Sequence, residues 1–166
     1  MRFEIVEIEE LSGDACKIYS IIEDGSADTL FDEFLEEMDV DHSSDVDTLW
    51  DKLRFIGKEG GARIQFFREN EGKPGDGVVA LLNASRFPLR LYCIRFGSVL
   101  LILGGGGYKD RSIRAWQDDE KLRKAAIRME QISSVITVRI RNREILIGPD
   151  GSLSGDLVFE DQDIEI

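Results

Sequence analysis

The side chains that could hold an anion gather in the middle of the chain. Between residues 73 and 114 the basic residues are Lys73, Arg86, Arg90, Arg95, Lys109, Arg111 and Arg114. Guanidinium and ammonium groups bind phosphates and carboxylates. Lys109 and Arg111 follow a continuously apolar run and four glycines, with Tyr108 in between. A strand that ends in bare backbone followed by cations is predicted to present positive charge beside a ligand.

The glycine run, residues 104–107, has two interpretations. Consecutive backbone N–H groups can form an anion-binding nest. A nucleotide-binding P-loop is not indicated, because Tyr-Lys-Asp follows the run where that motif has Gly-Lys-Ser/Thr opening a helix. We therefore expect the glycines to provide conformational freedom at a loop hinge.

The charge distribution permits a polyanionic partner although the net charge is -12. Residues 1–50 hold 2 basic and 16 acidic side chains, residues 51–116 hold 12 and 6, and residues 117–166 hold 7 and 11. A polyanion would bind the basic middle, and the acidic flanks would weaken and slow the encounter at low salt. The alternative is that most of these charges only solvate helix faces.

Other chemistries are poorly supported. His42, the one histidine, lies in a polar stretch with no nucleophile pattern beside it, which favours a surface loop residue over a catalytic base or metal ligand. Cys16 and Cys93 are too few and too far apart for a disulfide scaffold or a zinc site. The chain has no apolar run long enough to cross a bilayer and no apolar leader, which predicts a cytoplasmic protein without a membrane partner.

The elements that must position the cations follow from the hydrophobic pattern. Gly97-Ser98 separates two apolar runs, so residues 89–96 and 99–103 are predicted to form a tight antiparallel hairpin, and residues 78–82 add a strand before it. The run 99–103 is apolar throughout, so we expect it near the middle of the sheet with both faces covered.

Further elements flank this meander. We expect an N-terminal hairpin of strands 2–8 and 16–22, and helices over about 28–38 and 44–56. A third helix is expected from the N-cap Asp118 to Gln131, then a hairpin of strands 135–141 and 144–147, with a possible last strand at 157–159. The predicted fold class is α+β: an antiparallel sheet around a central hairpin at about 78–104, with helices on one face and hairpins at both ends.

This order of elements resembles the RelE/HigB-type toxins of bacterial toxin-antitoxin systems, within the RelE/ParE-like superfamily. The resemblance covers roughly residues 50–130. The segments that carry it are Gly61-Ala62-Arg63, Phe67-Arg68-Glu69, Glu71-Gly72-Lys73, Ala80-Leu81, Leu89-Arg90-Leu91-Tyr92-Cys93-Ile94-Arg95 and Gly107-Tyr108-Lys109. It is a divergent resemblance, because the family is typically small and basic, whereas this chain is acidic and has more than 30 residues after the last predicted helix.

The resemblance implies a bacterial, cytoplasmic mRNA endoribonuclease that inhibits translation, uses no metal or cofactor, and cleaves by attack of a ribose 2′-hydroxyl on the adjacent phosphate. Such chemistry needs groups that hold and neutralise the phosphate and an acid for the leaving oxygen. The catalytic candidates that it implies are Arg90, Lys109, Arg111 and Tyr108, and the RNA-binding candidates are Lys73, Arg86, Arg95 and Arg114.

It also implies partners, namely a cognate antitoxin protein and mRNA, the latter possibly bound on the ribosome. Residues 1–132 form the RelE-like domain in this interpretation, and residues 133–166 form a β extension with an acidic tail that could extend the sheet or build a homodimer edge. The alternative is a non-catalytic RelE-fold protein-binding module. There Arg90 pairs with an acidic neighbour, Lys109 and Arg111 are solubilising loop cations, and Tyr108 packs over the glycines.

Overall fold

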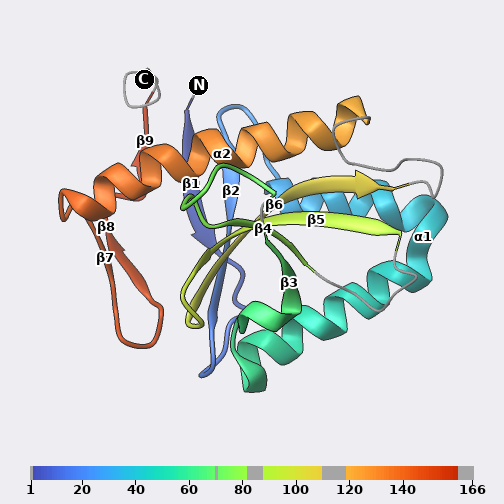
Figure 1. Cartoon of the computed structure of the whole chain (residues 1–166), viewed down its shortest axis with the longest axis horizontal. Helices are drawn as coiled ribbons and strands as arrows, with labels where there is room; N and C mark the ends of the chain where they lie inside the picture. Colours follow the sequence, from blue (N-terminus) through green and yellow to red (C-terminus); the bar gives the residue numbers. More distant parts are fainter. Residues whose placement is uncertain (1, 70, 82–87, 110–118, 161–166) are drawn as a thin grey trace.

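The computed structural model describes residues 2–69, 71–81, 88–109 and 119–160 (Figure 1). The larger elements in chain order are β1 (Phe3–Glu7), β2 (Lys17–Glu23), α1 (Leu30–Phe55), β3 (Phe67–Arg68), β4 (Val78–Leu81), β5 (Leu89–Phe96), β6 (Leu100–Tyr108), α2 (Glu120–Arg141), β7 (Ile145–Ile147), β8 (Leu153–Gly155) and β9 (Val158–Phe159). A π-helical turn, Ile56–Gly60, and a 3₁₀ turn, Ile64–Phe66, connect α1 to β3. No helix among the described residues is long and apolar enough to span a membrane.

The main sheet has seven strands in the order β3-β4-β5-β6-β2-β1-β9. The predicted N-terminal hairpin β1–β2 and the meander β4-β5-β6 are both confirmed. The sheet is mixed, however, so the prediction of an antiparallel sheet is wrong at one position: β2 pairs with β6 in parallel, from Lys17 opposite Leu100 to Ser20 opposite Leu103. This parallel pair joins the two antiparallel units into one sheet.

The helices cover both faces of the sheet, not one face as predicted (Figure 1). Phe31, Leu49 and Leu53 of α1 pack on the face that bears Leu101 and Leu103, whereas Met129 and Ile136 of α2 pack on the other face. The reason lies in the strands themselves. Leu100–Leu103 are fully buried and alternate between the two faces, so each face needs an apolar cover.

α1 contains the two predicted helices, which meet directly at a kink where the sequence predicted a loop. His42 has non-helical backbone angles, φ -135° and ψ 37°, in the polar stretch expected to be a loop. The helix begins at a capping box in which the Thr29 side chain accepts from the Asp32 N–H and the Asp32 carboxylate accepts from the Thr29 N–H. Polar residues near the break cost the helix little, because both flanking segments are fixed by buried apolar side chains.

The glycine run belongs to β6, so the predicted loop hinge is wrong. In the register Leu91 lies opposite Gly106 and Cys93 opposite Leu103, which leaves Gly104 and Gly105 together opposite Tyr92, as in a β-bulge. A Cβ on Gly106 would lie 1.7 Å from the Arg90 carbonyl oxygen, and one on Gly104 would lie 2.3 Å from Met129 Sδ. A side chain at position 106 would therefore collide with the β5 backbone, and one at position 104 would force the Met129 side chain of α2 to move.

α2 continues well beyond its predicted end at Gln131, and the predicted strand 135–141 is its last part. Ile132, Val135, Ile136 and Arg139 are buried at helical spacing, so packing overrides the β propensity of the β-branched residues here. The C-terminal hairpin is therefore β7–β8, and the expected last strand is present as β9, which pairs with β1.

Candidate functional site

Two of the predicted cations, Arg90 and Lys109, come together on the α2 face of the sheet. Arg90 lies opposite Gly107 on β6, and Lys109 follows two residues later, so their side chains leave the ribbon on the same side. The Lys109 backbone N–H donates to the Pro88 carbonyl oxygen at 2.6 Å, which continues the ladder past the last paired residues. The hairpin thus fixes both cations at its open end.

A third cation, Arg68, reaches the same place from the edge of the sheet. Arg68 of β3 lies opposite Ala80 of β4, and Ala80 lies opposite Tyr92 of β5. Residues that are directly opposite share a face, and Ala80 and Tyr92 both belong to the α2-side core. Arg68 therefore points to the α2 face, and its side chain is about half exposed.

The carboxylate of Glu71 lies next to these cations. The Arg90 Nη1 donates to Glu71 Oε1 at 3.2 Å, and the Arg68 Nε is 3.9 Å from the same oxygen. Only 3% of Glu71 is exposed. Burial raises the pKa of its carboxyl, although the positive charges of Arg90, Arg68 and Lys109 oppose that shift. We call Arg68, Glu71, Arg90 and Lys109 the cationic cluster, since three positive charges surround one carboxylate.

Two oxygens in this region are buried and accept no hydrogen bond from any described residue. They are Glu71 Oε2 and the hydroxyl oxygen of Tyr92. Burial raises the pKa of Tyr92 well above its ordinary value, and the charge of Glu71 adds to the effect, so this phenol stays neutral. An unsatisfied buried oxygen costs free energy, so this region has hydrogen-bonding capacity that no described residue uses.

Lys109 has the electrostatic setting of a proton donor. Its pKa is lowered by partial burial first and then by the positive charges of Arg90 and Arg68, while Glu71 acts in the opposite direction. A lysine with a lowered pKa gives up its proton more readily than an ordinary lysine. The cluster thus combines fixed guanidinium groups, which can hold a phosphate, with an ammonium group that can lose a proton.

Tyr108 points the other way. It lies opposite Leu89, whose side chain belongs to the α1-side core, and its ring stacks on His42 at the break in α1, with ring centroids 4.4 Å apart. The structure therefore places Tyr108 behind the sheet from Arg90 and Lys109. His42 also approaches Asp45 at 4.0 Å, so the histidine has a packing role at the helix break.

The remaining predicted residues do not join the cluster among the described parts of the chain. Arg95 lies at the opposite end of β5, where its Nε donates to the Ala62 carbonyl oxygen at 2.6 Å. Lys73 lies in the turn before β4 and borders a groove between that turn and α2. Arg86, Arg111 and Arg114 lie outside the described residues.

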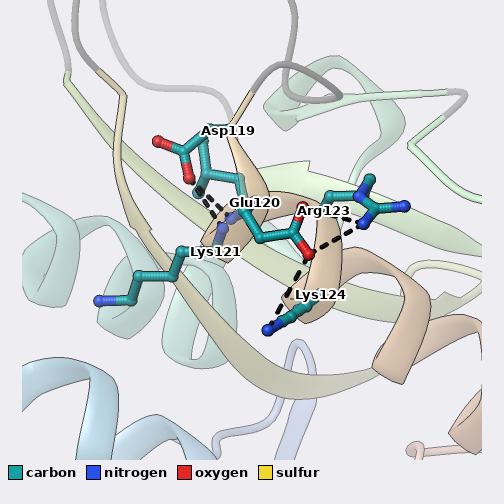
Figure 2. A network of polar contacts seen from close by, with 6 residues as sticks. Asp119, Glu120, Lys121, Arg123 and Lys124 are labelled. Carbon is teal, nitrogen blue, oxygen red and sulfur yellow. Dashed lines mark hydrogen bonds and ion pairs between the residues drawn. The ribbon is translucent and has the colours of Figure 1, made fainter.

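The start of α2, drawn in Figure 2, lies next to Gly107, the residue opposite Arg90. Asp119 Oδ1 accepts from the backbone N–H groups of Lys121 and Leu122 at 3.0 and 3.1 Å, an N-cap one residue later than predicted. Figure 2 shows Glu120 between Arg123 and Lys124, while the Lys121 side chain extends away from them. It pairs with Glu37 of α1, so the two helices are joined beside the end of β6.

Sequence reasoning missed Arg68, Glu71 and Tyr92. The position of Arg68 beside Arg90 follows from the strand register only if β3 is recognised as a strand. A strand of two residues has no periodic pattern by which the sequence could reveal it. Glu71 begins a dense turn signal, and a carboxylate in a turn is ordinarily solvated, so nothing local indicated its burial. Tyr92 was expected only as part of an apolar strand.

The described residues contain no group of His, Cys, Asp or Glu side chains arranged to hold a metal ion. Cys16 and Cys93 are buried free thiols. No family model matches this chain, and neither the curated proteins nor the solved structures include a significant match. The chemistry of the cationic cluster must therefore be argued from its own geometry.

Proposed function

We propose that this protein is a toxin-like endoribonuclease that cleaves mRNA without a metal ion, with the cationic cluster as its active site. The observation that carries the proposal is the convergence of Arg90 and Lys109, with Arg68, around a buried carboxylate at the open end of the β5–β6 hairpin. A phosphodiester is the common biological anion that such an array of two guanidinium groups and one ammonium group fits best.

The reaction follows from these groups. The ribose 2′-hydroxyl attacks the adjacent phosphorus, the bond to the 5′-oxygen breaks, and a cyclic phosphate and a free 5′-hydroxyl result. Arg90 and Arg68 would hold the phosphate and its developing charge. Lys109 would give its proton to the leaving oxygen, the 2′-hydroxyl proton would pass to solvent water, and the buried Glu71 would hold Arg90 in position.

The competing function is a protein-binding module without catalysis. The Arg90–Glu71 contact favours it, because a pair with both side chains largely buried is a familiar structural ion pair. In that case Lys109 would serve solubility alone, and a cognate partner protein would bind elsewhere on the fold.

Induced expression in a bacterium separates the two functions. Growth and mRNA integrity are measured for the wild type, Arg90→Ala, Lys109→Ala and the control Arg54→Ala. Arg54 is exposed near the end of α1, on the other face of the sheet. The proposal expects the wild type and Arg54→Ala to arrest growth and shorten mRNA, and the two cluster variants to be harmless. If all four chains are equally harmless at equal soluble yield, the ribonuclease proposal is wrong.

A further inference from the structure

A cleft of about 240 Å³ lies between the first turns of α1 and α2, next to the end of β6. Its walls are mainly apolar, formed by Leu30 and Phe34 of α1 and by Ala125 and Met129 of α2. Its floor is the backbone at Gly105 and Gly106. Figure 1 shows the two helices on either side of this end of the hairpin.

The bulge at Gly104 and Gly105 of β6 exposes the backbone that forms the floor of the cleft. A Cβ at Gly105 would meet no atom within 4 Å, so this position opens into space, whereas its neighbours Gly104 and Gly106 are closely packed. β2 pairs with β6 only as far as Leu103, so beyond that residue α1 borders the strand in place of a neighbouring strand. Glycine inside a strand commonly marks a bulge or a close approach by a ligand.

The cleft is adjacent to the cationic cluster. Gly107 lies opposite Arg90, and the floor residue Gly105 is two positions before it on the same strand, which corresponds to about 7 Å. A Cβ at Gly107 would already touch Leu122 and Lys121 at the start of α2, and Lys121 also lines the cleft. If an RNA phosphate lies at Arg90, the base of that nucleotide or of the next one can therefore reach the cleft.

The size and lining of the cleft select the ligand. Pockets for drug-sized molecules have volumes of about 300 to 1,000 Å³, so this smaller cleft suits a single planar ring system. Leu30 and Ala125 present partly exposed apolar surface on which such a ring can pack, with the buried Phe34 and Met129 behind them. The rim carries Glu33, Glu37, Lys121 and Lys124. Lys121 pairs with Glu37 and Lys124 approaches Glu120, so the polar edge of a nucleobase would bind to the donor and acceptor positions that these pairs leave open.

We propose that this cleft binds one unstacked nucleobase of the RNA whose phosphate is held by the cationic cluster. The inference rests on the proposed function and extends it by a base subsite. Bases held in this way are bound through their ring faces, so the subsite accepts several bases, and contacts to the rim charges add a preference among them.

The test fills the cleft without touching the cluster. Gly105→Leu adds a side chain where the backbone permits one and where open space exists, and Ala125→Leu narrows the same cleft from α2. Ala27→Leu adds the same bulk at an exposed position outside the cleft and is the matched control. The probe is a 2′-O-methyl RNA oligonucleotide, which cannot be cleaved, and the same oligonucleotide with one base removed at successive positions.

Fluorescence anisotropy is expected to show about tenfold weaker binding of the intact oligonucleotide by both cleft variants, as for the loss of one stacked base. Ala27→Leu should bind as the wild type does. For the wild type, removal of one particular base should cause the same loss, and the cleft variants should not distinguish that abasic oligonucleotide from the intact one. Thermal unfolding checks that each variant is folded.

Two results would overturn the base subsite. One is intact-oligonucleotide binding by both folded cleft variants at wild-type affinity. The other is that, relative to the wild type, the cleft variants lose as much affinity for the abasic oligonucleotide as for the intact one, which would place the effect on the phosphate site. Arg90→Ala separates this failure from failure of the proposed function. If it weakens binding while the cleft variants do not, only the base subsite is wrong, and if it changes nothing, the phosphate site is wrong as well.

Discussion

The two ends of β5 each carry an arginine and use it differently. At one end Arg90 is surrounded by Arg68 and Lys109 and pairs with the buried Glu71. At the other end Arg95 donates to the Ala62 carbonyl oxygen, next to the Ser98 backbone that also binds the Ala62 N–H. Three like charges around one carboxylate repel one another and destabilise the fold, whereas a single arginine that donates to a carbonyl oxygen does not. The proposed binding role therefore belongs to the first end, and the hydrogen bond of Arg95 is structural at the second.

The largest expected effect is on RNA cleavage. Arg90→Ala should lower the rate by about a hundredfold or more, since it removes a phosphate-binding guanidinium from the transition state. Arg95→Ala should stay within a few-fold of the wild type when the rate is expressed per folded molecule. The measurement is cleavage of an end-labelled RNA by the purified proteins.

Arg90→Ala also leaves Glu71 buried without its partner, so the double variant Arg90→Ala/Glu71→Gln is needed as a stability control. It should remain inactive although it carries no unpaired carboxylate. An equal loss of activity at both ends of β5 would abolish the distinction between them.

The second effect is on stability. Arg95→Ala should lower the free energy of unfolding by about 1 to 3 kcal/mol, because the buried carbonyl of Ala62 loses its donor. Arg54→Ala, at an exposed site, should leave it nearly unchanged. Urea unfolding followed by circular dichroism gives both values. If Arg95→Ala is as stable as the wild type, its hydrogen bond is not structural.

The third effect is on the titration of Lys109. Arg68 lowers the pKa of this lysine and Glu71 raises it. Arg68→Gln should therefore move the pKa upward, and Glu71→Gln should move it downward. Because a proton donor works only while protonated, activity should fall as the pH rises through this pKa, and in Arg68→Gln that fall should begin at higher pH than in the wild type.

Heteronuclear NMR of the Lys109 side chain measures the pKa directly in both variants, and the pH profile of cleavage tests the consequence in Arg68→Gln. Shifts in the same direction in the two variants would mean that the cluster is not organised around opposing charges.

The smallest effect concerns Tyr108. Because its ring faces His42 behind the sheet, Tyr108→Phe should cleave RNA within about twofold of the wild type, and Tyr108→Ala should cost about 1 kcal/mol of stability through the lost stack. Cleavage assays and thermal unfolding check both expectations. A large loss of activity in Tyr108→Phe would restore this phenol as a catalytic acid.

The strands of the meander were predictable, and the reason is local: Gly97-Ser98 between two apolar runs fixes the hairpin and hence the register that brings Arg90 and Lys109 together. The burial of Glu71 was not predictable, because it depends on which strands lie beside its turn. The C-terminal half of α2 was missed for a related reason. Its β-branched residues favour a strand locally, and only the sheet surface beneath them makes the helix the better solution.

The glycine run shows a third limit. Four glycines predicted a hinge, because an isolated sequence gives no indication of what approaches the backbone. In the fold Gly106 lies against the Arg90 carbonyl and Gly104 lies against Met129, while the bulge of Gly104 and Gly105 exposes backbone at the floor of the cleft. The glycines that predicted a mobile hinge instead allow β5 and α2 to pack closely against β6.

The parallel contact between β2 and β6 has a consequence for how the chain acquires its structure. Lys17 and Leu100 are adjacent in the sheet although 83 positions separate them in the sequence. During synthesis β2 can therefore pair with β6 only after β6 has been made, whereas the hairpins on either side can form as soon as their own strands are complete. We therefore expect the β2–β6 pair to form later than either hairpin, because strands so distant in the sequence pair slowly.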